Sequence, residues 1–250
     1  MRRAGTCLIL YSLLSPPVLA QAGSFAVDSC EAVVAADVNN DGKTDLLCPY
    51  DYGNAKTRTF VQLSGGTTSS AWTPWSPDHG AGSFAVGSCR DIVAGDVNGD
   101  GKTDLLCPYD YGNAKTRTFV QLSGGTTSSA WTPWSPDHGA GSFAVGSCRD
   151  IVAGDVNGDG KTDLLCPYDY GNAKTRTFVQ LSGGSTSSEW TPWSPDHGAG
   201  SFAVVYDAQY PRIVAGELVH YKTTLLITSV QGSRLVCYRS SDSRDTDSIN

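Results

Sequence analysis

The nine residues Asp96-Val97-Asn98-Gly99-Asp100-Gly101-Lys102-Thr103-Asp104 decide the fold of this chain. Oxygen-bearing side chains stand at loop positions 1, 3, 5 and 9, and position 6 is glycine. Carboxylate and amide oxygens around a sharp glycine turn are typical of a calcium loop. The pattern recurs at 155–163, and at 37–45 with Asn40 in place of the first glycine. The sequence therefore predicts three calcium ions.

The predicted metal ligands occupy positions 1, 3, 5 and 9, together with position 7, the backbone-carbonyl position of such loops. They are Asp37, Asn39, Asp41, Lys43 and Asp45; Asp96, Asn98, Asp100, Lys102 and Asp104; and Asp155, Asn157, Asp159, Lys161 and Asp163. We expect extracellular-type affinities, on the order of 10⁻⁴ to 10⁻³ M, and a structural role. The alternative is a set of Asn-Gly and Asp-Gly hairpin turns whose acids are solvated.

The flanks of the loop distinguish it from an EF-hand. An EF-hand has a bidentate Glu at position 12 and continues as a helix. Position 12 here is Cys107, and short apolar runs, 91–95 and 105–109, lie on either side of the loop. Such runs favour strands. We therefore expect a strand, a calcium loop and a second strand.

The chain repeats with a period of 59 residues. The units are 23–81, 82–140 and 141–199, followed by a degenerate unit, 200–240. Units two and three differ only at Thr126/Ser185 and Ala130/Glu189. In unit two, strands are expected at 91–96, 105–109, 117–123 and about 131–135, separated by turn clusters. Four strands per unit predict an all-β fold, a β-propeller.

The run from Phe84 to Leu106, with its calcium loop and flanking strands, resembles the FG-GAP/VCBS repeat family. That resemblance implies a calcium-binding propeller like that of integrin α-subunits or of secreted propeller lectins. Propellers of that family usually have seven blades, whereas this chain offers three and a degenerate fourth. We expect about four blades in one chain. The alternative is an open or partial propeller that a homodimer completes.

Six cysteines form three pairs, each separated by 18 residues. The degenerate unit has lost the counterparts of both members of a pair, as pairing within a unit predicts. We therefore expect the disulfides Cys30–Cys48, Cys89–Cys107 and Cys148–Cys166. Zinc is excluded, because no CxxC or Cys/His ligand spacing is present. Cys237 has no partner in this scheme.

The beginning and end of the chain are expected to lie outside the folded domain. Arg2 and Arg3 precede an apolar segment and small residues, so residues 1–20 are predicted to be a signal peptide of a secreted protein. The predicted domain spans 21–240, and the polar residues 241–250 are predicted to be disordered. No later stretch suits a membrane span. The net charge of −7 disfavours nucleic acid and anionic membranes as partners.

Tryptophans occur in pairs near Asp, His and Pro. Stacking on sugar rings would make them ligand-binding residues, whereas packing between blades would bury at least one of each pair. They are Trp72, Trp75, Trp131, Trp134, Trp190 and Trp193. His138 with Asp137 or Ser135 could form a catalytic group. However, three near-identical copies are unlike an asymmetric active site, so we expect no enzyme activity.

These features together predict a secreted, calcium-stabilised binding module. The expected partner is a glycan, as for a lectin, or an extracellular or cell-surface protein, as for an adhesion module. The alternative is a secreted hydrolase or a non-catalytic subunit of a secreted enzyme.

Overall fold

The computed structural model describes residues 25–198 together with the short segments 224–226 and 237–239. The predicted signal peptide and tail lie outside these residues, as does most of the predicted degenerate unit. Short 3-10 helices precede the first strand of each repeat: η1 (Val27–Ser29), η2 (Val86–Ser88) and η3 (Val145–Ser147). All other regular structure in the described residues is β.

Twelve strands form three four-stranded antiparallel sheets, one for each repeat. Sheet order follows chain order, so each repeat folds as an up-and-down blade. The strands are β1 (Val34–Ala36), β2 (Asp45–Asp51), β3 (Thr57–Gln62) and β4 (Thr73–Pro74) in blade 1; β5 (Val93–Gly95), β6 (Asp104–Asp110), β7 (Thr116–Gln121) and β8 (Thr132–Pro133) in blade 2; and β9 (Val152–Gly154), β10 (Asp163–Gly171), β11 (Lys174–Gln180) and β12 (Thr191–Pro192) in blade 3.

The alternation of side chains explains the third strand of each blade. In β3, Thr57, Thr59 and Val61 are buried, and the residues between them are partly exposed. A period of two is what a strand with unlike faces requires. All four predicted strands of unit two are confirmed, and the predicted propeller-type all-β fold is confirmed with them.

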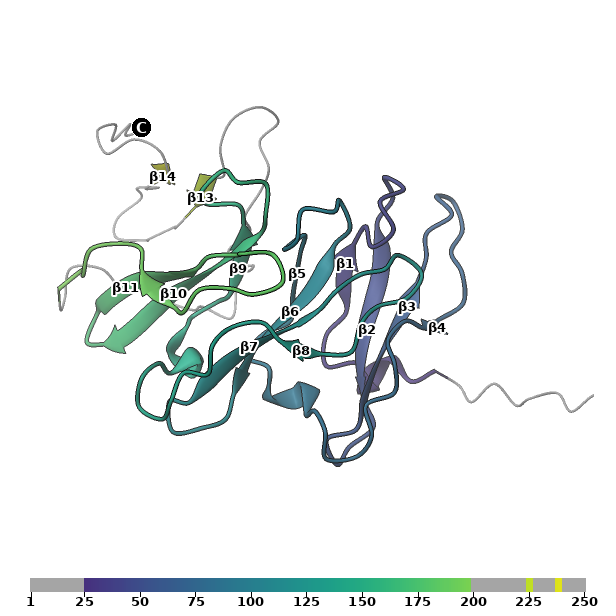
Figure 1. Cartoon of the computed structure of the whole chain (residues 1–250), viewed down its shortest axis with the longest axis horizontal. Coiled ribbons are helices and arrows are strands. Elements are labelled where there is room, and N and C mark those ends of the chain that lie inside the picture. Colours follow the sequence, from purple (N-terminus) through teal and green to yellow (C-terminus); the bar gives the residue numbers. More distant parts are fainter. Residues whose placement is uncertain (1–24, 199–223, 227–236, 240–250) are drawn as a thin grey trace, which may run out of the picture.

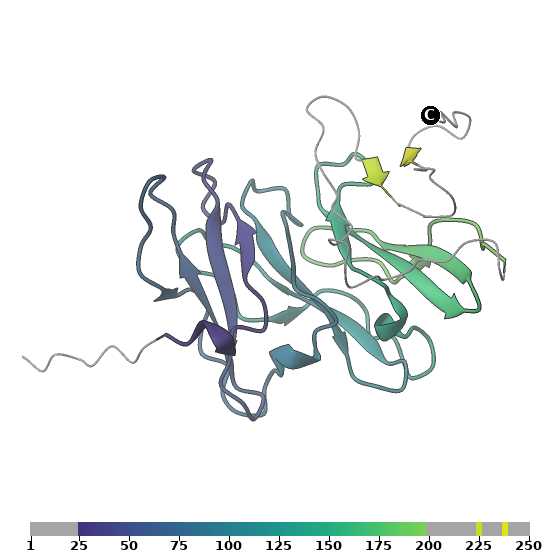
Figure 2. The same ribbon diagram turned by 180° about the vertical axis from the view of Figure 1, so that it is seen from behind.

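The blades stand side by side in chain order (Figures 1 and 2). Their innermost strands β1, β5 and β9 lie beside one another. Blades 1 and 3 therefore occupy opposite ends of an arc within the described residues. The remaining two strands, β13 (Thr224–Leu226) and β14 (Cys237–Arg239), pair antiparallel with each other. The expected fourth blade otherwise lies outside the described residues.

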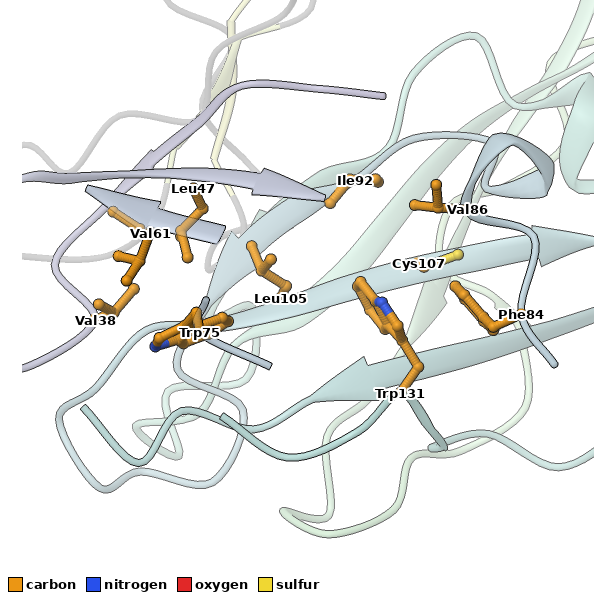
Figure 3. Packing of buried hydrophobic residues seen from close by; sticks show 11 residues of the cluster. Val38, Leu47, Val61, Trp75, Phe84, Val86, Ile92, Leu105, Cys107 and Trp131 are labelled. Carbon is orange, nitrogen blue, oxygen red and sulfur yellow. The ribbon is translucent and has the colours of Figure 1, made fainter. Parts of the chain in front are cut away.

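The two larger hydrophobic clusters lie between blades, and a third, smaller cluster lies within blade 3. One cluster combines Val38, Leu47 and Trp75 of blade 1 with Val86 and Leu105 of blade 2 (Figure 3). A second cluster repeats this arrangement between blades 2 and 3. Because a single sheet cannot enclose its own apolar faces, each blade depends on its neighbours for burial.

Candidate functional site

The predicted calcium loops connect the first and second strands of each blade. In the middle loop, Asp96 Oδ1 accepts hydrogen bonds from the backbone N–H groups of Gly99 at 2.7 Å and Asp100 at 3.2 Å. Asp96 Oδ2 accepts the N–H of Gly101 at 2.7 Å. Gly101 has a φ of +82°, a conformation that glycine adopts without steric cost. The carboxylate of position 1 thus organises the whole turn.

Side chains of positions 1, 3 and 5 converge in this loop. Asn98 Oδ1 accepts the same Asp100 N–H at 2.9 Å that Asp96 also accepts. Asn98 Nδ2 lies 3.4 Å from Asp100 Oδ2, and Lys102 Nζ lies 3.5 Å from that oxygen. The same side chains meet in the first and third loops. Each loop therefore gathers two carboxylates and one amide at an accessible point.

The carboxylate of position 9 has a different environment. Asp104 is fully buried, and its oxygens accept the N–H groups of Val97 at 3.1 Å and Ser123 at 2.7 Å. Burial raises the pKa of Asp104 to about 6, although the two backbone hydrogen bonds act to lower it. Asp45 and Asp163 make the equivalent bonds. This aspartate holds the loop against the connection after the third strand.

The donor chemistry of these loops fits a hard cation such as Ca²⁺. Within the described residues, no three His, Cys, Asp or Glu side chains gather as a group, so the third convergent oxygen in each loop comes from asparagine. In the middle loop, the side-chain oxygens of Asp96, Asn98 and Asp100 would hold the ion. Each Asp104 oxygen accepts one backbone hydrogen bond and keeps a second lone pair that could also bind the ion. A cation would neutralise part of the clustered negative charge.

Backbone hydrogen bonds connect the loops of neighbouring blades. The N–H of Thr103 donates to the carbonyl of Asp37 at 3.1 Å, and the N–H of Thr162 donates to the carbonyl of Asp96 at 2.8 Å. The first residue of one loop therefore contacts the eighth residue of the next. The three candidate sites form a row along the inner edges of the blades.

The three predicted disulfides are present: Cys30–Cys48, Cys89–Cys107 and Cys148–Cys166. Each joins the segment after a 3-10 helix to the second strand of the same blade, with a Cα–Cα distance of 5.2 Å. The pairing within units is confirmed. Three intramolecular disulfides are typical of extracellular proteins.

Most of the tryptophans pack inside the protein. Trp75 and Trp134 are 1% exposed, and their indole N–H groups donate to the carbonyls of Gly125 at 2.8 Å and Gly184 at 2.9 Å in the following blade. The first tryptophan of each pair stacks on a phenylalanine; the pairs are Trp72 with Phe25, Trp131 with Phe84 and Trp190 with Phe143. Ligand binding by tryptophan stays a prediction only for the more accessible Trp72 and Trp193.

The residues of the hypothetical catalytic group have other partners. The Ser135 hydroxyl accepts the Thr118 N–H at 2.9 Å and donates to the Pro136 carbonyl at 2.8 Å. Asp137 pairs with Lys115 at 3.4 Å. His138 is buried, and burial lowers its pKa. Ser135 and His138 are thus part of the buried interior of blade 2, and Asp137 is part of its surface.

Sequence reasoning missed an exposed tyrosine where the second strand of every blade meets the turn to the third strand. In blade 2, Tyr111 is nearly half exposed, and Lys115 Nζ lies 5.1 Å from the centre of its ring. Asp110 accepts the Gly112 N–H at 2.7 Å and fixes the turn. We call this repeated surface the tyrosine rim; it consists of Tyr52, Lys56 and Asp78, Tyr111, Lys115 and Asp137, and Tyr170, Lys174 and Asp196.

The rim lies at the opposite ends of the second strands from the candidate calcium loops, because β2, β6 and β10 run from one to the other. The sequence placed Tyr111 in a turn, but a turn residue can fold inward or outward. Its repetition in all three units was the available signal. That signal could not distinguish exposure from packing.

A model of the FG-GAP-like repeat matches the chain twice, at residues 37–107 and 96–166. The two matches overlap and together span more than half of the 250 residues. The chain belongs to the FG-GAP-like repeat family. Each FG-GAP match begins at position 1 of a candidate calcium loop and ends at the disulfide cysteine of the next blade. The family's repeats make it a β-propeller-type binding module.

Comparison with curated proteins gives no match. Among the described residues of this FG-GAP repeat protein, no helix has the length and apolar character required to cross a membrane.

Proposed function

We propose that this FG-GAP repeat protein is a secreted, calcium-stabilised module that binds an extracellular protein or a carbohydrate through the tyrosine rim. The observation that carries the proposal is the threefold repetition of one exposed surface. Each copy combines an aromatic face, a lysine and an aspartate, and these groups suit both partner classes. Tyrosine supplies a rigid contact area together with a hydroxyl for hydrogen bonding.

Repetition of the rim favours a multivalent mode of binding. Tyr52, Tyr111 and Tyr170 sit at equivalent positions of adjacent blades, each with a lysine amine about 5 Å from the ring centre. A ligand with regularly repeated groups could occupy more than one copy. Linked contacts of this kind raise the apparent affinity without any new contact.

Calcium has a structural part in this proposal. The ions would tie the first two strands of a blade together and hold the row of loops at the inner edges. We propose no catalytic step, because Ser135 and Asp137 are engaged in local contacts. The three internal disulfides support an extracellular location.

Ligand binding can be tested with two arrays, one of glycans and one of extracellular proteins, probed with the chain in calcium buffer. We expect saturable binding to one array, lost in the triple variant Y52A/Y111A/Y170A. The control T73A/T132A/T191A changes one exposed residue per blade on β4, β8 and β12 and should bind normally. Equal binding by both triple variants would exclude the rim as the binding surface.

A further inference from the structure

Seven large hydrophobic side chains are exposed among the described residues, and they form two groups. Three are the tyrosines of the rim, which have the same environment in every blade. The other four have buried counterparts in the other two blades; they are Val27, Val33, Leu46 and Trp193. Such residues expose a surface that elsewhere in the chain forms an interface.

In blades 2 and 3, one face packs on the preceding blade and is buried. Val27, Val33 and Leu46 lie on the equivalent face of blade 1. We call it the leading face of blade 1. Leu46 is 37% exposed, whereas Leu105 and Leu164 are 0% exposed. Val27 is 50% exposed, and its counterparts Val86 and Val145 are also fully buried. Both counterpart pairs belong to the clusters that pack on the preceding blade.

The leading face also contains a hollow of about 280 Å³. Leu46, Gln62 and Gly66 are among its lining residues. Gly66 corresponds to Gly125 and Gly184, whose carbonyls accept the indole N–H groups of Trp75 and Trp134. The same backbone position that receives a tryptophan twice inside the chain is therefore exposed on blade 1.

The tryptophan that would donate this hydrogen bond is exposed in blade 3, at the other end of the arc. Trp193 is 37% exposed, compared with 1% for Trp75 and Trp134. On the same side of blade 3, Leu165 and Val179 are buried, so Trp193 is the exposed large hydrophobic residue of this side among the described residues. Residues 200–250 contain no tryptophan. They cannot supply an indole to the leading face of blade 1.

Charge favours the same pairing of surfaces. At the interface of blades 2 and 3, Arg90 donates to the carbonyl of Cys148 at 2.8 Å. Its counterpart Arg149 is part of blade 3. In unit one, the positions corresponding to Gly146 and Arg149 are the exposed acids Asp28 and Glu31. A head-to-tail contact would bring Arg149, which pairs with Asp169 in its own blade, towards these two acids.

We propose that the leading face of blade 1 binds the Trp193 side of blade 3 in a second copy of this chain. The indole of Trp193 would enter the hollow and donate to the Gly66 carbonyl, as Trp75 does at Gly125. The contact is heterologous, since two different surfaces meet, and such contacts produce rings or open arrays according to geometry.

Light scattering of the disulfide-bonded chain in calcium buffer tests the proposal. We expect the mass of two or more chains, falling to one chain for L46D and for W193A. The control A140D places the same new charge at an exposed position of blade 2 and should keep the assembled mass. Unchanged thermal unfolding midpoints would show that L46D and W193A remain folded.

Mixing the two variants distinguishes a head-to-tail contact from a symmetric one. L46D keeps Trp193, and W193A keeps the leading face, so the mixture retains one intact contact and should form a two-chain species. A single-chain mass for the unsubstituted protein would overturn the proposal, because the chain would then cover its own ends. Assembly unaffected by either substitution would also overturn it.

Discussion

Trp75 and Trp193 have the same sequence neighbours, Pro and Ser, and opposite environments. Trp75 is enclosed between two blades and donates its indole N–H to the Gly125 carbonyl at 2.8 Å. Trp193 has no following blade within the described residues and is partly exposed. The identical local sequence therefore has a stabilising role only where a neighbouring blade completes the contact.

Replacing Trp75 with Phe removes the indole N–H and leaves the Gly125 carbonyl without this donor in a buried interface. We expect the free energy of unfolding to fall by about 1–3 kcal/mol. Urea unfolding under conditions where the chain is monomeric measures the change. The matched control W193F should shift it by less than about 0.5 kcal/mol. Equal effects at both positions would contradict the role assigned to the interface.

His79 links stability to pH. Its Nε2 accepts the backbone N–H of Trp131 in the next blade at 3.2 Å, which only the neutral imidazole can do. Burial lowers the pKa of His79 below 6.5, and the charge of Asp78 acts in the opposite direction. The stabilisation is therefore present above pH 6.5 and is lost as the pH falls through the lower folded-state pKa.

The variant H79Q keeps a hydrogen-bond acceptor and removes the titration. We expect the stability of the unsubstituted chain, relative to H79Q, to decrease between pH 7 and pH 5. Urea unfolding of both chains at each pH gives this difference, in which the contributions of other titrating groups cancel. A constant difference would show that His79 does not titrate with folding.

At the scale of the elements, each blade has two devices that tie its first two strands: a candidate calcium loop and a disulfide. The loop connects β5 to β6 directly, and the Cys89–Cys107 bond joins the segment before β5 to the middle of β6. Both act on the first strand of the blade, which has only three residues. The two devices should therefore stabilise each blade independently.

Removing the middle disulfide with C89A/C107A should cost about 3 kcal/mol, because the bond closes a loop of 18 residues. Chemical unfolding of the two chains provides the comparison. The matched variant C30A/C48A removes the equivalent disulfide from blade 1. That blade has only one neighbouring blade among the described blades. An unchanged unfolding midpoint in C89A/C107A would argue against a stabilising bond.

Calcium should raise the thermal unfolding midpoint, and EDTA should reverse the rise. Because positions 1, 3 and 5 converge, D100A should lower the bound calcium from three ions to two, as measured by calorimetric titration. K102A is the control, since it keeps every oxygen donor of the loop, including the backbone carbonyl. Coincident midpoints with and without calcium would exclude the metal from these loops.

The sequence predicted the elements better than their surroundings. The runs 91–96, 105–109 and 117–123 correspond to β5, β6 and β7, because each combines a short apolar pattern with a turn signal at both ends. The disulfides followed from spacing and from their joint loss in the degenerate unit. Exposure of Tyr111 was not predictable, and neither was which tryptophan of each pair is buried, since both depend on how neighbouring blades meet.

In the whole molecule, the two large core clusters share blade 2. One cluster joins it to blade 1, and the other joins it to blade 3. A blade that unfolded alone would therefore expose the apolar face of its neighbour. We therefore expect the arc, rather than the blade, to be the cooperative unit of unfolding.

We expect one unfolding transition for blades 1 to 3. Far-UV circular dichroism, which reports the strands, and tryptophan fluorescence, which reports the interfaces, should give the same urea midpoint. V61A, a buried change in the first cluster only, should move both signals together. Separate midpoints for the two probes would show that the blades unfold one at a time.

The Trp-to-Gly contact between blades has one further consequence, for how this protein changes over generations. Every 59-residue unit carries the indole on one side and the accepting carbonyl on the other, so an added unit brings both halves of its own joint. Unequal recombination between near-identical units would therefore lengthen or shorten the array without requiring a new interface. The number of repeat units would then set the length of the tyrosine rim and the number of ligand contacts that we propose for it.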